Sequence, residues 1–328
     1  MSELTEPMDT ITPGGPAALV LRDLVKKYGE LTAVDHLSLE VNRGEVFGFL
    51  GPNGAGKTTA IRMMCGLLKP TEGEVFIDGL RVAPVRDRDT RAKVGICPQE
   101  NILWHKLSCF EQLVFSARMY NVSRAEARSR AEKMLEAMGL ASKRNKMAAT
   151  LSGGMKRRMN VIMAMMHDPD ILVFDEPEAG LDPQSRLLVR DFIRDAARLK
   201  TVIVTTHNID EAERIADRVA IIDSGKLLRL DTPDKLKASI GEGDILEMTL
   251  FTAQAAGFER IATRLNSLGY AVTRREDHFL IRARNLVSRI QEIHQVLEKE
   301  EVGIREMKIR QNTLEDVFIH LTGKSLRS

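Results

Sequence analysis

The sequence has few cysteines and almost no excess charge. It holds three cysteines in 328 residues, without the spacing of a metal site. A sparse, odd cysteine count is typical of a reducing compartment, where each thiol behaves as a small buried hydrophobe. The 48 basic and 46 acidic residues leave a net charge of +2. This balance gives no support for a nucleic-acid partner.

Long apolar runs are missing as well. No run approaches the roughly 18 residues that a membrane-spanning helix needs, and the first residues lack the apolar core of a signal peptide. We therefore expect any work at a membrane to be done through a partner. The 43% hydrophobic and 29% charged residues are those of an ordinary globular protein, and the length suggests two domains.

What the sequence does contain is a phosphate-binding loop, GPNGAGKTT, which matches G-x-x-x-x-G-K-[ST]. An expected strand at 45–50 precedes it and an expected helix at 60–68 follows, which argues against a chance glycine-rich turn. Glycines let backbone N–H groups point inward, and the helix amino terminus adds positive charge. The side chain of Lys57 can reach the β- and γ-phosphates, and the Thr58 hydroxyl can ligate Mg²⁺. The predicted phosphate-binding residues are Gly51, Pro52, Asn53, Gly54, Ala55, Gly56, Lys57, Thr58 and Thr59.

Two acids follow a second apolar segment. Residues 171–174 predict a buried parallel strand, which ends in Asp175 and Glu176. Asp175 is predicted to hold the Mg²⁺ ion, and Glu176 to orient or deprotonate the attacking water. The alternative, two acids on a surface loop, is disfavoured by the four apolar residues before them.

The rest of the pattern predicts an α/β protein with distinct parts. Residues 1–16 are rich in structure-breaking residues and predict a flexible leader. Alternating strands and helices through 45–230 predict a mainly parallel sheet covered on both faces. A helical insertion is expected at about 101–168. We expect this domain to span 17–238 and a small α+β domain to span 239–328.

Local signals place individual elements. Alternating apolar residues predict strands at 18–22 and 33–41. Capping-box spacing, in which an acid follows serine or threonine by three residues, predicts the start of a helix. These pairs are Ser108 with Glu111, Ser123 with Glu126, and Thr313 with Asp316.

Together the motifs resemble the nucleotide-binding subunit of ATP-binding cassette (ABC) transporters over about residues 17–232. The motifs, in the family's order, are GPNGAGKTT at 51–59, Gln99, LSGGM at 151–155, ILVFDEP at 171–177, Gly180-Leu-Asp-Pro183 and His207. The resemblance implies the P-loop NTPase fold of the ABC cassette, with an antiparallel β subdomain beside the mainly parallel sheet. It also implies ATP and Mg²⁺ as cofactors.

The resemblance assigns roles beyond the phosphate loop. Tyr28 would stack on adenine, although a half-buried tyrosine at a strand end is the alternative. Gln99 would complete the Mg²⁺ shell and sense the attacking water, and otherwise it is a loop amide. His207 would contact the γ-phosphate and stabilise the transition state, and otherwise it is structural. With Glu176, Gln99 and His207 form the expected catalytic set.

Some of the implied roles belong to a second subunit's site. Ser152, Gly153 and Gly154 would cap the γ-phosphate held by the opposite subunit, and Asp182 would lie at the dimer seam. The resemblance therefore implies two subunits stacked head to tail around two ATP molecules. A homodimer fits a chain that holds every motif once, and a heterodimer is the alternative.

The sequence departs from the family pattern at two positions. Met155 stands where glutamine is frequent, and we expect it to preserve activity because backbone amides and Ser152 make the phosphate contact. Glu178 stands where threonine is frequent. It adds a negative charge near the site, which bears on the hydrolysis rate.

The run LSGGMKRR and the ending at 313–323 resemble the type-2 exporter branch, which serves efflux of drugs, antibiotics and other hydrophobic substrates. Its membrane domain is a separate polypeptide, so the resemblance implies a permease partner and a place at the cytoplasmic face of the cell membrane. Residues 101–107 resemble the surface that grips the permease. Trp104 is either an anchor there or core of the helical insertion.

Other functions stay open as alternatives. An importer ATPase shares the core motifs but not the carboxyl-terminal ending. A non-transport ABC ATPase of repair or translation would carry long coiled coils or a second cassette, and neither is found here. The carboxyl-terminal domain could regulate, stabilise the dimer, contact the permease or simply pack.

Overall fold

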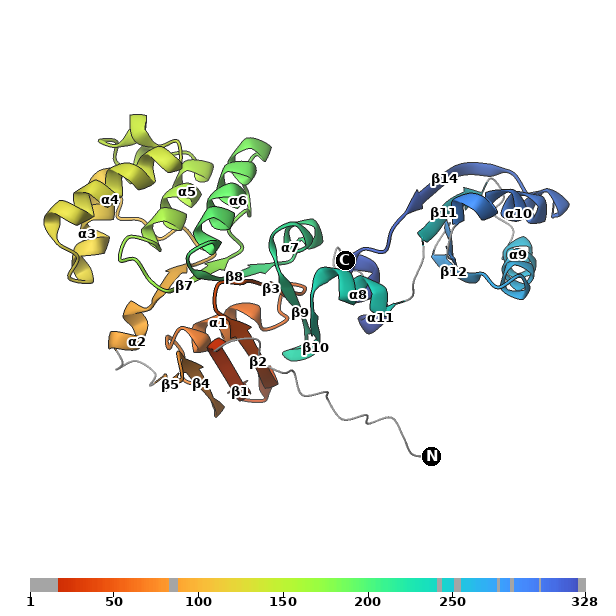
Figure 1. The fold of residues 1–328 in the computed structure, drawn as a ribbon, viewed down its shortest axis with the longest axis horizontal. Coiled ribbons are helices and arrows are strands. Elements are labelled where there is room, and N and C mark those ends of the chain that lie inside the picture. Colours follow the sequence, from red (N-terminus) through yellow and green to blue (C-terminus); the bar gives the residue numbers. More distant parts are fainter. Residues whose placement is uncertain are drawn as a thin grey trace. The chain divides into compact units, whose positions relative to one another are not determined.

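A computed structural model of the protein describes residues 17–82, 88–240, 244–250, 255–275, 278–283, 286–300 and 302–323. The expected leader at 1–16 lies outside these ranges. The chain divides into two compact units, Met1–Thr232 and Pro233–Leu326 (Figure 1).

A six-stranded sheet forms the centre of the first unit. Its strands, in spatial order, are β10 (Lys226–Asp231), β9 (Arg218–Asp223), β3 (Val46–Leu50), β8 (Thr201–Thr206), β7 (Ile171–Asp175) and β6 (Val94–Cys97). Neighbouring strands from β9 to β6 pair in parallel, and β10 is antiparallel to β9. Every residue of β3, β7 and β8 is buried, as expected for a sheet covered on both faces.

Alternate residues of these strands belong to different cores. Leu172 and Phe174 of β7 pack into a core shared with the helical region, α5 (Gly153–Met163) and α6 (Pro183–Ala197). Val173 points to the opposite face, into a core that includes α1 (Lys57–Met64). Because successive side chains of a strand point to opposite faces, one sheet packs against a layer of helices on each side.

A second, antiparallel sheet shares the core that contains α1. Its strands, in spatial order, are β2 (Leu31–Asn42), β1 (Ala17–Tyr28), β4 (Glu72–Ile77) and β5 (Leu80–Arg81). Both β1 and β2 are longer than the strands that alternation predicts, because they pair with each other through several register shifts.

The predicted helical insertion is formed mainly by α3 (Cys109–Met119) and α4 (Arg124–Ala137) before α5. The 3₁₀ turns Ala141–Lys143 and Ala148–Thr150 connect α4 to α5, and α2 (Arg88–Ala92) precedes β6. The predicted capping box at α3 is confirmed: the Glu111 amide donates to the Ser108 hydroxyl at 3.2 Å, and the Ser108 amide donates to the Glu111 carboxylate at 2.8 Å.

The second unit is a small α+β assembly. Its antiparallel sheet has the order β12 (Ala271–Arg275), β13 (His278–Ala283), β11 (Asp244–Leu250), β14 (Ile304–Arg310). Its helices are α8 (Pro233–Ser239), α9 (Ala255–Ser267), α10 (Leu286–Lys299) and α11 (Leu314–Thr322). The unit begins earlier than the boundary expected at 238/239, because α8 packs against α11.

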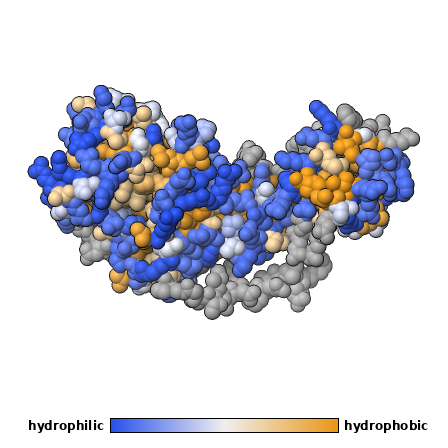
Figure 2. Space-filling view, turned by 45° about the horizontal axis from the view of Figure 1, so that its top comes forward, coloured by the Kyte–Doolittle hydropathy of each residue, from blue (hydrophilic) through white to orange (hydrophobic). Residues whose placement is uncertain are grey.

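One face of the molecule shows how polar and apolar residues are distributed over the described part of the chain. Hydrophilic residues cover most of the face seen in Figure 2, and apolar residues form separate patches. Among the helices of the described ranges, none combines the length and apolarity needed to cross a membrane. The three cysteines are buried and free, and burial raises the pKa of Cys65 to about 12 and that of Cys97 to about 11. The prediction that they act as buried hydrophobes is confirmed.

Candidate active site

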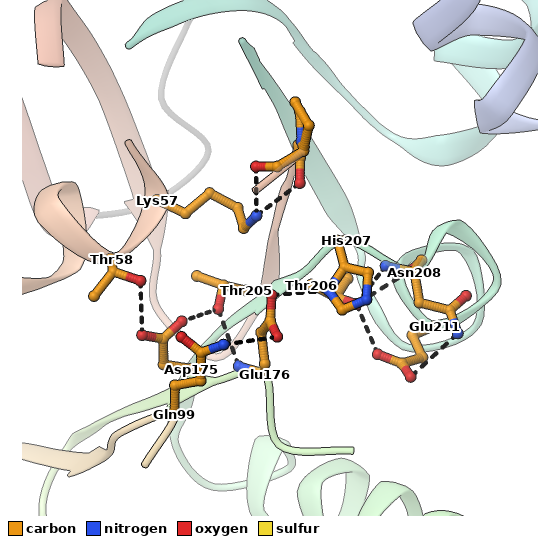
Figure 3. A network of polar contacts seen from close by, with 12 residues as sticks. Lys57, Thr58, Gln99, Asp175, Glu176, Thr205, Thr206, His207, Asn208 and Glu211 are labelled. Carbon is orange, nitrogen blue, oxygen red and sulfur yellow. Dashed lines mark hydrogen bonds and ion pairs between the residues drawn. The ribbon is translucent and has the colours of Figure 1, made fainter. Parts of the chain in front are cut away.

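The candidate site lies where parallel strands end. The phosphate loop follows β3, Gln99 follows β6, Glu176 follows β7 and His207 follows β8. Because the carboxyl ends of parallel strands share one edge of a sheet, these residues meet there (Figure 3).

The phosphate loop is shaped by glycine. Gly56 is the N-cap of α1 with φ 95°, a left-handed conformation that glycine adopts without strain. A Cβ at this position would also collide with the carbonyl oxygen of Ala33. The loop therefore needs glycine there both for its backbone angle and for the close approach of a neighbouring strand.

Lys57 points back over the loop that precedes it (Figure 3). It is 6% exposed, and its Nζ donates to the carbonyl oxygens of Gly51 at 2.6 Å and Pro52 at 3.0 Å. Burial lowers the pKa of Lys57, while the carboxylates of Glu176 and Asp175 act in the opposite direction. A buried cation is thus held beside the loop amides, which suits a polyanionic ligand.

Hydroxyl groups surround the Asp175 carboxylate. Thr58 Oγ1 donates to Asp175 Oδ2 at 3.1 Å, and Thr205 Oγ1 donates to Oδ1 at 2.5 Å. The described residues contain no cluster of three or more His, Cys, Asp or Glu side chains that could hold a metal. Mg²⁺ bound to nucleotide needs only one or two protein ligands, so the Thr58 hydroxyl and the Asp175 carboxylate fit it.

Glu176 is the centre of the predicted catalytic set. His207 Nδ1 lies 2.8 Å from its Oε1, and Gln99 Nε2 donates to its Oε2 at 3.2 Å. Glu176 is 7% exposed and has φ 49°, a conformation that costs a non-glycine residue about 1 kcal/mol. Strained backbone concentrates at functional sites, and here the amide of Glu176 is held by Thr205, both through its carbonyl and through its hydroxyl oxygen, each at 3.1 Å.

Two residues support the site in ways that the sequence did not indicate: Thr205, and Glu211, which was expected only to cap a helix with Asn208. The Glu211 carboxylate accepts from the Thr206 hydroxyl at 2.7 Å and from Asn208 Nδ2 at 3.3 Å, so it braces both neighbours of His207. Burial raises the pKa of Glu211. The signal for Glu211 was its place in the first turn of α7 (Ile209–Ile215), after Asn208, whose side chain caps that helix.

Tyr28 lies apart from the catalytic cluster, at the end of β1. Its side chain is 50% exposed, and Lys26 Nζ lies 5.2 Å from the ring centre. An exposed ring suits stacking, but none of its contacts among the described residues tests adenine binding, so its role stays a prediction.

The signature turn, residues 152–154, opens α5. Ser152 caps the helix by accepting from the Met155 amide at 3.3 Å, and a Cβ on Gly153 would meet nothing within 4 Å. Asp182 caps α6 in the same way, accepting from the Ser185 amide at 2.9 Å, and this bond lowers its pKa. Within the described chain, the hydrogen bonds of Ser152 stay inside its own helix.

Glu178, which was expected to add a negative charge near the site, is held by an ion pair. It is 1% exposed and pairs with Arg190 of α6. Arg190 Nε and Nη2 donate to the two carboxylate oxygens at 3.0 and 2.7 Å. A two-fold charged hydrogen bond neutralises the carboxylate locally and ties the end of β7 to α6.

Glu178→Ala is expected to lower the free energy of unfolding by about 3 kcal/mol, because it leaves the partly buried Arg190 without this carboxylate. Chemical denaturation measures the change. The double variant Glu178→Leu/Arg190→Met should recover most of the loss. Asp195→Ala, which breaks an exposed pair with Arg198, should change little. A loss below about 1 kcal/mol for Glu178→Ala would contradict a buried ion pair.

The fold and the site together define a class of protein. A mainly parallel sheet, a glycine-rich loop that leads into a helix, a buried lysine and two acids at the end of β7 are the parts of a P-loop nucleoside triphosphatase.

Comparisons with known proteins narrow this class. A family model described as "ABC transporter" matches residues 34–179. The chain is 39% identical to Nod factor export ATP-binding protein I of Paraburkholderia xenovorans, over 95% of this chain and 99% of that protein. It is 37% identical to the daunorubicin/doxorubicin resistance ATP-binding protein DrrA of Streptomyces peucetius, over 93% and 92%.

Solved structures agree. The structure of an ATP-binding subunit of an ABC transporter superposes with a TM-score of 0.64 at 28% identity, covering 68% of this chain and 93% of that one. A dimeric ATP-binding cassette in a post-hydrolysis state, bound to ADP and Pi, gives 0.61 at 28% identity, covering 65% and 98%.

The chain belongs to the ABC transporter family, as an ATP-binding subunit, and it is an ATPase. The resemblance to the drug- and antibiotic-type branch, the cassette fold and the ATPase activity predicted from the sequence are thereby confirmed.

Proposed function

We propose that this chain powers an exporter as a Mg²⁺-dependent ATPase, working as a dimer at the cytoplasmic face of the membrane and driving a separate permease. The observation that carries the proposal is the meeting of Gln99, Glu176 and His207 beside Lys57 and Asp175 at one sheet edge. The export and resistance names of the relatives support the direction of transport.

The phosphate end of the site has two tasks. Lys57 and the loop amides bind the β- and γ-phosphates, and Thr58 with Asp175 holds the cation. When bound, Mg²⁺ supplies charge neutralisation of the phosphates. The two oxygen ligands, Thr58 Oγ1 and Asp175 Oδ2, lie 3.1 Å apart, close enough to bind one cation.

Glu176 is the residue that activates the attacking water. Both of its carboxylate oxygens are engaged, by His207 and by Gln99. Each carboxylate oxygen keeps a second lone pair, so Glu176 can accept a proton from water while both contacts hold it in place. The side chain of His207 is 48% exposed and is the contact that we assign to the γ-phosphate.

The position of the signature turn supports the dimer. Residues 152 and 153 are exposed, and a Cβ on Gly153 would stand in open space. The turn is therefore free to cap the γ-phosphate bound by a second subunit. The relative with ADP and Pi is described as dimeric, which supports the same arrangement.

An apolar surface beside the site suits the permease. Trp104 is 40% exposed and meets Phe115 edge to face with ring centres 5.2 Å apart. A hollow of about 490 Å³ extends from Thr58, Gln99 and Asp175 of the site to the apolar side chains of Ile61, Leu67 and Ile102. Partly exposed aromatic residues beside a hollow are typical anchors of an interface.

Trp104→Ala is expected to weaken co-purification with the permease at least tenfold while leaving ATP affinity unchanged, because it removes an aromatic anchor outside the phosphate site. Tagged pull-down and nucleotide titration measure the two effects. Leu199→Ala, at a side chain that is 90% exposed after α6, is the control and should bind normally. Normal pull-down by Trp104→Ala would place the interface elsewhere.

The reconstituted complex tests the proposal as a whole. The full chain with its permease should hydrolyse MgATP faster when a hydrophobic cargo is added and should move that cargo away from the ATP side. Movement toward the ATP side would favour an importer. Turnover that no membrane partner affects would favour a non-transport ATPase.

A further inference from the structure

Arg157 of α5 occupies an unusual place for a charged residue. It is 3% exposed, and its guanidinium donates to backbone carbonyls at the ends of β6 and β7. The five bonds are Nε to Pro177 O at 3.2 Å, Nη1 to Pro98 O at 2.5 Å and Gln99 O at 3.0 Å, and Nη2 to Asp175 O at 2.5 Å and Glu176 O at 2.9 Å.

These contacts use the whole hydrogen-bonding capacity of the side chain. A guanidinium has five N–H donors in a rigid, planar fork, and each of them has a carbonyl acceptor here. A buried charge is tolerated only when it is well satisfied, so the two strand ends have to keep the positions that the fork dictates.

The two strand ends carry the catalytic set. Gln99 and Glu176 both offer their carbonyl oxygens to Arg157, while their side chains meet each other 3.2 Å apart. The same helix begins at Ser152 in the signature turn. The Arg157 guanidinium therefore connects α5 with the ends of β6 and β7, three elements that lie far apart in the sequence.

We propose that Arg157 is a positioning residue for ATP hydrolysis, which holds Gln99 and Glu176 in register with the helix that begins at the signature turn. The proposal rests on the proposed function, in which Gln99 and Glu176 face the attacking water. Arg157 acts through the backbone of these residues, because all five of its N–H donors bond to carbonyl oxygens. A displacement of α5 is passed directly to the residue that activates water.

The test is a substitution that keeps the positive charge but removes the planar, five-donor geometry of the guanidinium. Lysine has three donors on a point charge and cannot satisfy five carbonyls. Arg157→Lys is expected to lower kcat at least about tenfold, since small displacements of catalytic groups cost this much. The KM for ATP should stay within about threefold, because the phosphate loop and Lys57 keep their contacts.

Arg158→Lys is the matched control. Arg158 is the next residue of the same helix, and its Nη1 donates to the carbonyl of Met138 at 2.8 Å, away from the strand ends. Its kcat and KM should stay within about twofold of wild type. Phosphate release by the full chain, measured over a range of ATP concentrations, gives both constants for each variant.

The outcomes separate cleanly. A kcat loss for Arg157→Lys at unchanged KM, absent in Arg158→Lys, supports the proposal. Wild-type kcat, or a rise in KM that matches the loss, overturns it. Circular dichroism shows whether the variant folds; if it does not, Arg157→Gln is measured in the same way, and failure of both to fold also overturns the proposal. Absence of ATP turnover in the wild-type chain would instead count against the proposed function.

Discussion

Glu176→Gln should bind MgATP with near wild-type affinity and lose steady-state hydrolysis at least about a hundredfold. The amide keeps the size of the carboxyl group and can still contact Gln99 and His207, but it cannot accept a proton from water. The left-handed backbone at this position is held by Thr205 and does not depend on the carboxylate. Nucleotide titration and phosphate release measure the two effects separately.

Glu136→Gln is the control, since Glu136 is exposed on α4 and should leave both quantities unchanged. Phosphate release close to wild type in Glu176→Gln would remove Glu176 from the role of general base. If Glu176→Gln also lost ATP binding, the charge of Glu176 would be needed for nucleotide binding and not only for proton transfer.

The sequence predicted best those features that depend on residues close together in the chain. The apolar run in β7 can only be satisfied by burial on both faces, so its place as a buried parallel strand could be predicted. Ser108 and Glu111 bond to each other within one turn of helix, so the start of α3 was also predictable. The convergence of four motifs at one edge followed from the parallel strands that carry them.

Non-local pairing explains what the sequence did not predict. The strand expected at 18–22 extends to Tyr28 through charged residues, because β2 and β4 pair with it on either side. The sequence did not predict the pairing of Glu178 with Arg190, because the two side chains meet only once α6 has folded. The carbonyls around Arg157 come from two strand ends that no sequence pattern connects to α5.

Lys57→Ala should lose nucleotide affinity by at least about thirtyfold, which corresponds to about 2 kcal/mol. The substitution removes the buried cation beside the loop and leaves only the amides and the helix terminus to bind the phosphates. Lys69→Ala, at an exposed lysine after the same helix, should bind normally. Normal affinity of Lys57→Ala would place the triphosphate elsewhere.

Gly153→Asp should lose ATP turnover for a different reason. A side chain at Gly153 has free space in its own subunit, so the chain should fold and bind ATP in its intact loop. The carboxylate would face the γ-phosphate of the partner and repel it, and turnover should be lost. At ATP concentrations near the wild-type Kd, each variant by itself should then have little turnover, one because of its loop and the other because of its signature turn.

Mixing these two variants tests directly whether each site is built from two subunits. A mixed dimer contains one intact site, which combines the loop of the Gly153→Asp chain with the signature turn of the Lys57→Ala chain. An equal mixture should recover turnover of up to about a quarter of the wild-type rate, since half of the dimers carry one good site of two. A mixture that stays as inactive as the separate variants would contradict the composite site.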